Sequence, residues 1–426
     1  MFDLKSYYRQ NRKQLTSNLL IALVFAIPLY DKLVVYIILL ILLDWLIGGH
    51  WKHRFNLIKE NKSRQYLLSF SSLYLAYCLG LIYTENISYA LFDLGVKLSL
   101  LIFPLIFASM DDDIITEKWF YKILYSYLFG SIGITLVVLI WASMNFSRTN
   151  STEVFYYKYL SAFQHPSYLA MNLDFAVACI IFILLRKGKE LKKNLRNGLI
   201  MLIGYFFAII IMLASKAGII SLLMVFVFSI ASIIIYRKDY VIGILFLFIV
   251  PFSFIGAYYV FPNTFTRINK TTDVVTGVNQ FDSTTTEGTG ERLLIWGSSL
   301  ELIRQHPVIG VGTGDVKDVL LKKYKEKGIT NAFLQRLNAH NQYLQTTIAL
   351  GLIGLLVLLL SLYITLHEAI KQENLLVFLF VMIIAFNLLV ESMFERQAGI
   401  VFYSFFNCLL FYWMRVQKKP GTSKLT

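Results

Sequence analysis

The feature that most constrains this chain is a series of apolar runs, each about 20 residues long, that recur along all 426 residues. An α-helix of about 20 residues crosses the roughly 30 Å hydrocarbon layer of a bilayer. The runs are continuously apolar, whereas strands of a membrane β-barrel alternate apolar with polar residues. Because lipid offers the backbone no hydrogen-bond partners, the sequence predicts an all-α, polytopic integral membrane protein.

The composition and the placement of charge support this class. Hydrophobic residues make up 57% of the chain and charged residues only 15%, whereas a soluble domain carries about 25% charged residues. A net charge of +14 would suit a nucleic-acid-binding protein, but the basic residues lie mostly in short segments between apolar runs. That distribution is typical of cytoplasmic loops, so we expect no nucleic-acid partner.

We predict about twelve transmembrane helices from the lengths of the apolar runs. They cover residues 16–31, 33–49, 66–83, 91–109, 119–142, 167–185, 197–214, 217–236, 240–260, 341–366, 374–391 and 398–415. Three parts follow: an N-terminal bundle of about nine helices in 1–260, a long loop in 261–340, and C-terminal helices with a short tail in 341–426. The first run continues to span length without a small-residue cleavage site, so we expect no cleavable signal peptide.

Basic segments predict the orientation. Under this count one side receives residues 5–13, 50–64, 186–196, 236–239 and 415–419, all rich in Lys and Arg. That side should be the cytoplasm, with both termini in it. The long loop 261–340 then lies on the outer side of the membrane.

The long loop divides into a flexible part and short helices. Residues 271–290 are rich in Thr, Gly and Asp, which predicts a flexible loop. Residues 291–305, ERLLIWGSSLELIRQ, space their apolar residues by three and four, which predicts an amphipathic helix at the membrane surface. HPVIGVGTG ends that helix, and DVKDVLLKKYKEKG reads as a second short helix.

Three side chains at the outer membrane boundary could handle an anionic substrate. His340 immediately precedes an apolar run, and a neutral imidazole can accept a proton from a hydroxyl near neutral pH. Arg267 and Arg292 flank the flexible loop, and a guanidinium binds phosphate oxygens through two parallel hydrogen bonds. A helix cap or membrane anchor for the histidine, and solvated charges for the arginines, are the alternatives.

Lys216 lies between two apolar runs with almost no loop around it. An ionisable group at such a depth is costly and points to function, although a lysine at a tight outer turn can also extend its amine to water. Glu391, Glu395 and Arg396 form a further outer cluster, for which an ion pair bracing two helices is the simplest role. Residues that could line the same outer cavity are His165, Tyr168, Trp296, Asn341, Glu391 and Arg396.

Two other motifs do not indicate a cofactor. GVGTG at 310–314 has the glycines of a nucleotide loop but follows no strand. The three aspartates at 111–113 face the predicted cytoplasm and precede a helix, where acidic residues favour the helix dipole. The outer side offers no cluster of carboxylates or histidines of the kind that holds a metal. We therefore expect neither a metal nor another cofactor.

Several of these segments together resemble the bacterial O-antigen ligase and O-antigen polymerase superfamily. The resemblance rests on RLLIWGSS at 292–299, HPVIGVGTG, HNQYLQTTIALGLIGLL from His340, GLIYTENISYALFDLGVKLSLLIFPLIF, ASKAGI and NLLVESMFERQ. It implies an inner-membrane glycosyltransferase that takes a glycan from undecaprenyl diphosphate on the periplasmic face, without a metal and with inversion. Ligases transfer the glycan to the lipid A core, and polymerases transfer it to another lipid-linked repeat unit.

The resemblance also assigns roles to residues. His340 matches the catalytic histidine, and Arg292 matches the loop arginine that binds the diphosphate. Lys216 stands where ligases usually carry an arginine, so the positive charge is kept and the two-pronged guanidinium is lost. A transporter or flippase for lipid-linked sugar is the rival from another class; it would carry internal repeats and charged or broken helices at mid-membrane, of which the sequence gives no sign.

Overall fold

The structure is a computed structural model that describes residues 4–235, 238–261, 264 and 288–417. Within these residues it consists of helices joined by turns, with no strand, which confirms the all-α class. The α-helices are α1 Leu4–Ala26, α2 Asp31–Ile47, α3 Trp51–Lys59, α4 Asn61–Leu79, α5 Ile87–Lys97, α6 Ser99–Ala108, α7 Glu117–Thr149, α8 Tyr157–Leu160, α9 Pro166–Lys187, α10 Lys193–Met212, α11 Lys216–Ile235, α12 Tyr240–Val260, α14 Gly288–Gln305, α15 Val316–Glu326, α16 Thr330–Leu334, α17 Gln342–Lys371, α18 Leu375–Val390 and α19 Gln397–Gln417.

Each predicted span contains helix, but the count of twelve is not confirmed. In the described part of the chain, nine helical segments are long and apolar enough to cross a bilayer. The α2 helix reaches this length only together with α3, from which it is bent by 103°, and α18 has 16 residues. The first half of α1 is basic, which shortens its apolar part. The protein is thus a helical membrane protein with fewer clear spans than the run lengths predict.

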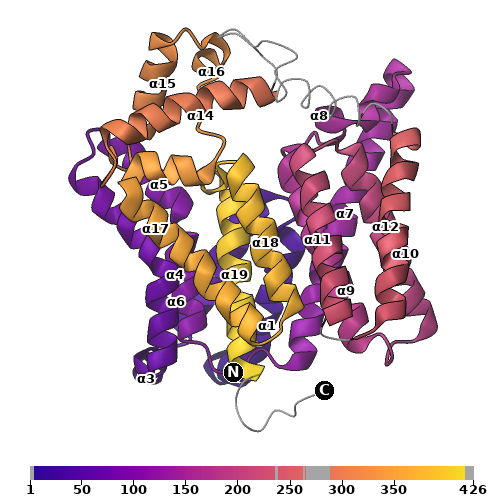
Figure 1. Ribbon diagram of the computed structural model, residues 1–426. Helices are drawn as coiled ribbons and strands as arrows, with labels where there is room; N and C mark the ends of the chain where they lie inside the picture. The colour runs from indigo at the N-terminus through magenta and orange to yellow at the C-terminus, as the bar shows by residue number, and fades with distance from the viewer. Residues whose placement is uncertain (1–3, 236–237, 262–263, 265–287, 418–426) are drawn as a thin grey trace.

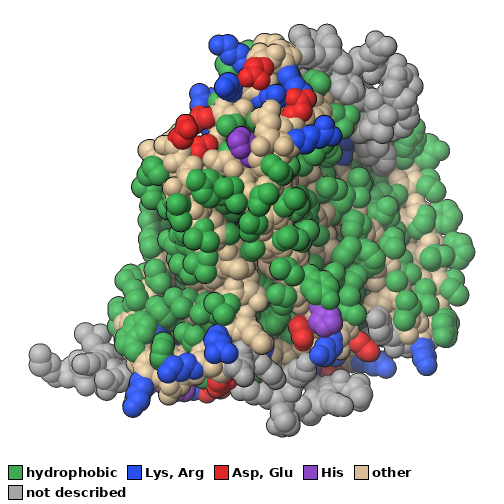
Figure 2. All heavy atoms as spheres, turned by 60° about the vertical axis from the view of Figure 1, so that its left-hand side comes forward, with side chains coloured by type: hydrophobic (Ala, Val, Ile, Leu, Met, Phe, Trp, Pro, Cys, Tyr) green, Lys and Arg blue, Asp and Glu red, His purple; other side chains and the backbone are tan. Residues whose placement is uncertain are grey.

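The helices form a bundle with a distinct cap at one end. Figure 1 shows α14, α15 and α16 lying over one end of the bundle, here called the outer end, while α1 begins and α19 ends at the opposite, inner end. Nearly every side chain of α9 is buried, and α19 packs against α6. Figure 2 shows a broad belt of hydrophobic side chains between charged groups at the two ends, as expected of a surface that faces lipid.

The three aspartates at 111–113 form contacts with basic side chains from three other helices at the inner end. Asp111 lies 2.7 Å from His53, Asp112 lies 3.1 Å from Arg415, and Asp113 pairs with Lys13. These pairs join α1, α3 and α19 to the turn before α7. The aspartates therefore brace the bundle.

The outer part of α17 is broken at Gly351, where φ is 64° and ψ is −163°. Residues 307–312 dock into the break: the amides of Val311 and Gly312 donate to the carbonyls of Ile348 and Ala349 at 2.9 and 3.0 Å. On the other side, the Leu352 amide donates to the Pro307 carbonyl at 2.8 Å. No broken span was expected in this run, and that expectation was wrong. The glycine-rich motif is a structural plug for that break.

Gly351 is required in this break because its backbone conformation is open only to glycine. A Cβ there would also lie 2.1 Å from the Val308 carbonyl oxygen. We expect Gly351→Ala to destabilise the protein by about 2–4 kcal/mol, seen as a lower melting temperature of the purified protein by intrinsic fluorescence. Gly256→Ala on α12 is the control, since a Cβ there meets nothing within 4 Å. Equal melting temperatures for the two variants would contradict this account.

Candidate active site

The centre of the site is the carboxylate of Glu391, which joins two distant parts of the chain. Its Oε1 accepts a hydrogen bond from Arg292 Nη2 at 2.5 Å, and its Oε2 lies 3.2 Å from His340 Nδ1. Arg292 lies on α14, His340 immediately precedes the N-cap of α17, and Glu391 follows the last residue of α18. Three elements of the outer end thus meet at one buried acid.

Two hydrogen bonds from backbone amides to side chains fix the relative position of His340 and Glu391. The amide of Asn341 donates to Ser392 Oγ at 3.2 Å, and the amide of Phe394 donates to Gln342 Oε1 at 2.7 Å. Each bond connects the start of α17 with the segment between α18 and α19. The two loops therefore behave as one unit, and the imidazole and carboxylate are held facing each other.

His340 itself adopts a left-handed backbone conformation, with φ of 45°. This conformation is uncommon for a residue other than glycine and is found disproportionately at functional sites. If Nδ1 carries the proton donated to Glu391, Nε2 retains a free lone pair. The side chain is 24% exposed, so the imidazole is not fully enclosed by protein.

The electrostatics keep Glu391 ionised. Burial by itself would raise the pKa of this carboxyl, but the hydrogen bond from His340 and the positive charge of Arg292 bring the pKa below its ordinary value. The carboxylate can therefore orient the imidazole and stabilise its protonated form. The Arg292 side chain is 31% exposed, so part of its guanidinium faces the outside of the site.

Lys216 is brought to the helix that carries Arg292. It begins α11 directly after a tight turn in which Ala214 has φ of 48°. Its Nζ donates to Thr289 Oγ1 at 3.0 Å, and Thr289 lies in the first turn of α14, three residues before Arg292. The two cations predicted from the sequence thus approach the same helix end from different parts of the fold.

His165 shares the electrostatic environment of the site. It is the N-cap of α9, and its Nδ1 accepts a hydrogen bond from the Ser167 amide at 3.3 Å. Burial, foremost, lowers the pKa of His165, and the charges of Arg292, Arg396 and His340 lower it further, whereas Glu391 acts in the opposite direction. The imidazole of His165 is therefore held neutral beside the Glu391 centre. Tyr168, one turn on, is buried with its ring 6.2 Å from that of His165.

Of the remaining residues that the sequence analysis assigned to the site, those that the structure describes form no hydrogen bond or ion pair with Glu391. Asn341 is buried and caps α17, with its side chain accepting from the Leu344 amide at 3.1 Å. Trp296 is half-buried on α14. Arg396 is exposed. Arg267 lies outside the described residues, as does most of the predicted flexible loop 271–290.

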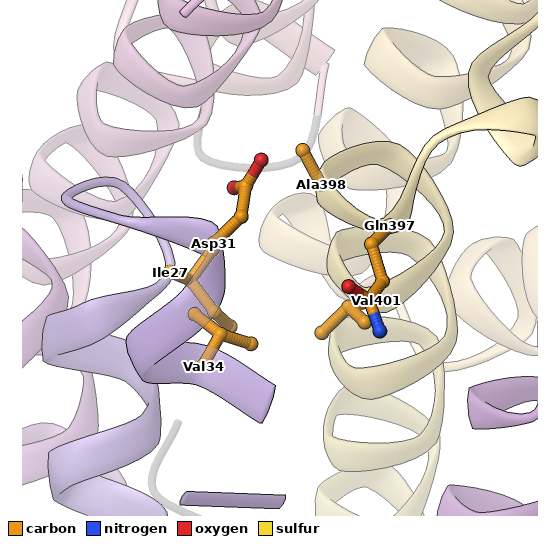
Figure 3. Close-up of a pocket in the computed structure, with 6 residues that line it drawn as sticks. All are labelled: Ile27, Asp31, Val34, Gln397, Ala398 and Val401. Carbon is orange, nitrogen blue, oxygen red and sulfur yellow. The ribbon is translucent and has the colours of Figure 1, made fainter. Parts of the chain in front are cut away.

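A small cleft next to Arg396 lies between the start of α2 and the start of α19. Figure 3 shows Asp31 facing Ala398 across it. Its lining residues are Ile27, Asp31, Val34, Gln397, Ala398 and Val401. Its volume of about 10 Å³ is room for a single water molecule, so this cleft does not hold a sugar or a diphosphate.

The sequence reasoning missed a buried ion cluster whose member Glu395 lies four residues after Glu391. Lys97, which is fully buried, pairs with Asp93 and lies 3.0 Å from Glu395, with the Tyr77 ring centroid 4.8 Å away. The spacing of Asp93 and Lys97 by four residues on one helix was a readable signal, but their partner Glu395 is distant in sequence. Asp174, fully buried eight residues into α9, is a charged residue at mid-membrane of the kind of which the sequence gave no other sign.

Among the described residues, no group of three or more His, Cys, Asp or Glu side chains is arranged to hold a metal ion. Comparison with protein families adds one finding. A family model described as O-antigen ligase matches residues 198–359. The matched part includes Lys216, Arg292 and His340 and ends before Glu391. None of the curated proteins compared with the chain matches it.

The depressed pKa of His165 predicts a loss of stability in mild acid. The unfolded chain binds a proton near pH 6.5, whereas the folded protein does so only at lower pH. Between these values the unfolded state binds more protons, so the free energy of unfolding falls as the pH falls. We expect His165→Asn, which retains a capping side chain and does not titrate, to lose less melting temperature between pH 7 and pH 5 than the wild type.

The control for this measurement is His306→Asn, because His306 is exposed just beyond the end of α14. It should follow the wild-type pH profile. Parallel profiles for His165→Asn and the wild type would show that His165 titrates normally.

Proposed function

We propose that this chain, which belongs to the O-antigen ligase superfamily, is a glycosyltransferase that moves a glycan from undecaprenyl diphosphate to a sugar hydroxyl. The family consists of membrane enzymes of the glycosyltransferase type. The observation that carries the proposal for this chain is the Glu391 carboxylate between His340 and Arg292, with Lys216 bound to the same helix as Arg292.

In the proposed reaction His340 is the general base. Its Nε2 takes the proton from the acceptor hydroxyl while the hydroxyl oxygen forms a bond to the anomeric carbon of the donor. The bond between that carbon and the diphosphate oxygen breaks, and undecaprenyl diphosphate leaves with the electron pair. Attack opposite the leaving group inverts the anomeric centre. Glu391 accepts from Nδ1–H, holding the tautomer and stabilising the imidazolium that forms.

The second requirement of the reaction is to neutralise the charge of the leaving diphosphate, and the two cations can do this. A diphosphate is a good leaving group, provided that the charge growing on its bridging oxygen is neutralised. Arg292 offers a planar set of donors to phosphate oxygens, and Lys216 adds a compact charge nearby. This division of roles needs no metal ion.

The arrangement of the ends supports a periplasmic site. The site lies under α14–α16 at the outer end, and the basic segments that follow α2 and α9 lie at the inner end, where α19 ends. We propose that the inner end faces the cytoplasm with both termini, that the protein lies in the bacterial inner membrane, and that the donor reaches the site from the outer leaflet. The lipid A core is the proposed acceptor.

Two alternative functions can be separated from the proposed one by experiment. A repeat-unit polymerase would use the same chemistry with a lipid-linked acceptor. Deleting the gene separates the two: absence of polymer on the lipid A core with long lipid-linked chains indicates a ligase, and a single-repeat product indicates a polymerase. A transporter would move the lipid-linked sugar without forming a glycosidic bond, and reconstitution with donor and acceptor would reveal this.

The role of His340 predicts a large and specific loss of activity. We expect His340→Ala to reduce the rate of glycan transfer in vesicles about 10²- to 10⁴-fold, the range supplied by a general base. His306→Ala removes an exposed imidazole at the same end of the molecule and should leave the rate unchanged. Transfer by His340→Ala at the wild-type rate, with the protein inserted at the same level, would refute the assignment.

The role of Lys216 predicts a graded effect on donor binding. Lys216→Ala should raise the KM for the lipid-linked donor about 10- to 100-fold, the value of a charge-assisted hydrogen bond. Lys216→Arg keeps the charge and should stay within about threefold of the wild type, because guanidinium binds phosphate at least as well. The measurement is transfer rate against donor concentration. If Lys216→Ala changed neither KM nor kcat, the lysine would have no part in diphosphate binding.

A further inference from the structure

The buried ammonium of Lys97 lies between two carboxylates that depend on it. Lys97 is the last residue of α5, and its side chain has no exposed surface. Its Nζ pairs with Asp93 on the same helix and lies 3.0 Å from Glu395 Oε1, in the segment between α18 and α19. Two largely buried carboxylates thus share one ammonium, and removing it would leave both without compensation. The position of Glu395 is therefore tied to α5.

A second set of contacts leads from Lys97 to the start of α17. The ammonium lies 4.8 Å from the ring centroid of Tyr77, within the range of a cation–π interaction. The Tyr77 hydroxyl lies 3.2 Å from Thr346 Oγ1, and Gln342 Nε2 donates to the same oxygen at 3.0 Å. These three side chains are buried. Because Gln342 begins α17 two residues after His340, Lys97 is linked to the helix end that follows the imidazole.

These contacts close into a ring. The Gln342 side chain uses both of its polar atoms: Nε2 donates within α17, and Oε1 accepts from the amide of Phe394 at 2.7 Å. Phe394 directly precedes Glu395, whose carboxylate leads back to Lys97. The ring joins α4, α5, α17 and the 3₁₀ turn Met393–Glu395. A buried polar network whose members are all bonded makes the surrounding structure more rigid.

The imidazole and the carboxylate of the candidate site are attached to two members of this ring. His340 lies two residues before Gln342, and Glu391 lies four residues before Glu395. The distance of 3.2 Å between His340 Nδ1 and Glu391 Oε2 therefore depends on how the ring holds the two segments. Lys97 cannot contact a substrate itself, because protein covers its whole side chain.

We propose that Lys97 is a positioning residue for glycan transfer: through the ring it holds the Glu391 carboxylate at hydrogen-bonding distance from His340. The inference rests on the proposed function, in which His340 is the general base. Orientation of such a group matters because a displacement of about 1 Å, caused by a change far from the chemistry, can cost about 10²-fold in rate. The role differs from that of Arg292 and Lys216, which are proposed to bind the diphosphate and so to affect donor binding.

The first test separates positioning from substrate binding. Lys97→Met keeps the length of the side chain and removes its charge. We expect it to lower kcat about 10- to 100-fold and to leave the KM for the lipid-linked donor within about twofold of the wild type, with rates in vesicles expressed per folded protein. Asp174→Asn alters another fully buried ionisable group, on α9, and should change neither constant. An unchanged kcat, or a KM that rises while kcat stays the same, would overturn the proposal.

A milder variant decides the question if Lys97→Met is not inserted into the membrane. Tyr77→Phe removes the hydroxyl that bonds to Thr346 and keeps the ring beside Lys97. It should lower kcat about three- to tenfold, the value of one hydrogen bond, at an unchanged donor KM. Tyr74→Phe, one turn earlier on α4, is the control, since the Tyr74 hydroxyl forms no hydrogen bond with a described residue. Equal kcat values for the two tyrosine variants would then refute the ring.

The second test repeats the inserted variant, Lys97→Met or Tyr77→Phe, in the His340→Ala background. Residues that act as a unit have non-additive effects on rate. If Lys97 acts through the imidazole, its loss should lower the residual rate of His340→Ala by less than about twofold. A further loss as large as that in the wild-type background would show a general effect on the fold and overturn the proposal, while leaving the role of His340 intact. A wild-type rate for His340→Ala alone would instead contradict the proposed function.

Discussion

The interaction on which the outer end depends is the pair of bonds made by the buried Glu391 carboxylate. An ionised carboxylate that is taken out of water is costly unless charged or hydrogen-bonding partners surround it. Here Arg292 and His340 supply those partners from α14 and from the start of α17. The position of the cap over the bundle is therefore linked to the position of the segment after α18. Removing either partner would leave the carboxylate buried with less compensation, which costs more than the bond alone.

Two other features hold the segments around that carboxylate in place: the ion pair of Lys97 and the break in α17. The fully buried ammonium of Lys97 binds Glu395, four residues after Glu391, and so fixes the segment that carries the acid. The break at Gly351 separates the first residues of α17 from its long inner part, and residues 307–312 satisfy the backbone groups that the break exposes. A short helical piece can thus hold His340 under α14 without following the axis of the membrane span. Irregular backbone at membrane depth is tolerated where protein covers it.

Sequence reasoning recovered what depends on local pattern. The helical class and the short helices α14 and α15 follow from run length and apolar spacing. His340, Arg292 and Lys216 were selected for their position and for the cost of charge near lipid; the structure gives their contacts, and their roles stay predictions. The central role of Glu391 did not follow, because its partners lie 99 and 51 residues away. The helix break at Gly351 could not be predicted either, because an isolated glycine in an apolar run is common in membrane helices. The span count is not confirmed where an apolar run includes basic or short portions, as in α1 and α18.

The charge balance of the site explains why an acid is placed between two cations. Glu391, Arg292 and Lys216 together contribute a net charge of about +1 when His340 is neutral, and the proposed proton transfer raises it by one. The added charge appears as negative charge grows on the leaving diphosphate. The interaction is therefore stronger in the transition state than in the bound donor, and only such a difference accelerates the chemical step. Without Glu391 the site would already be more positive before the reaction and would hold the diphosphate product more tightly. The protonated imidazole of His340 would also lose the carboxylate that stabilises it.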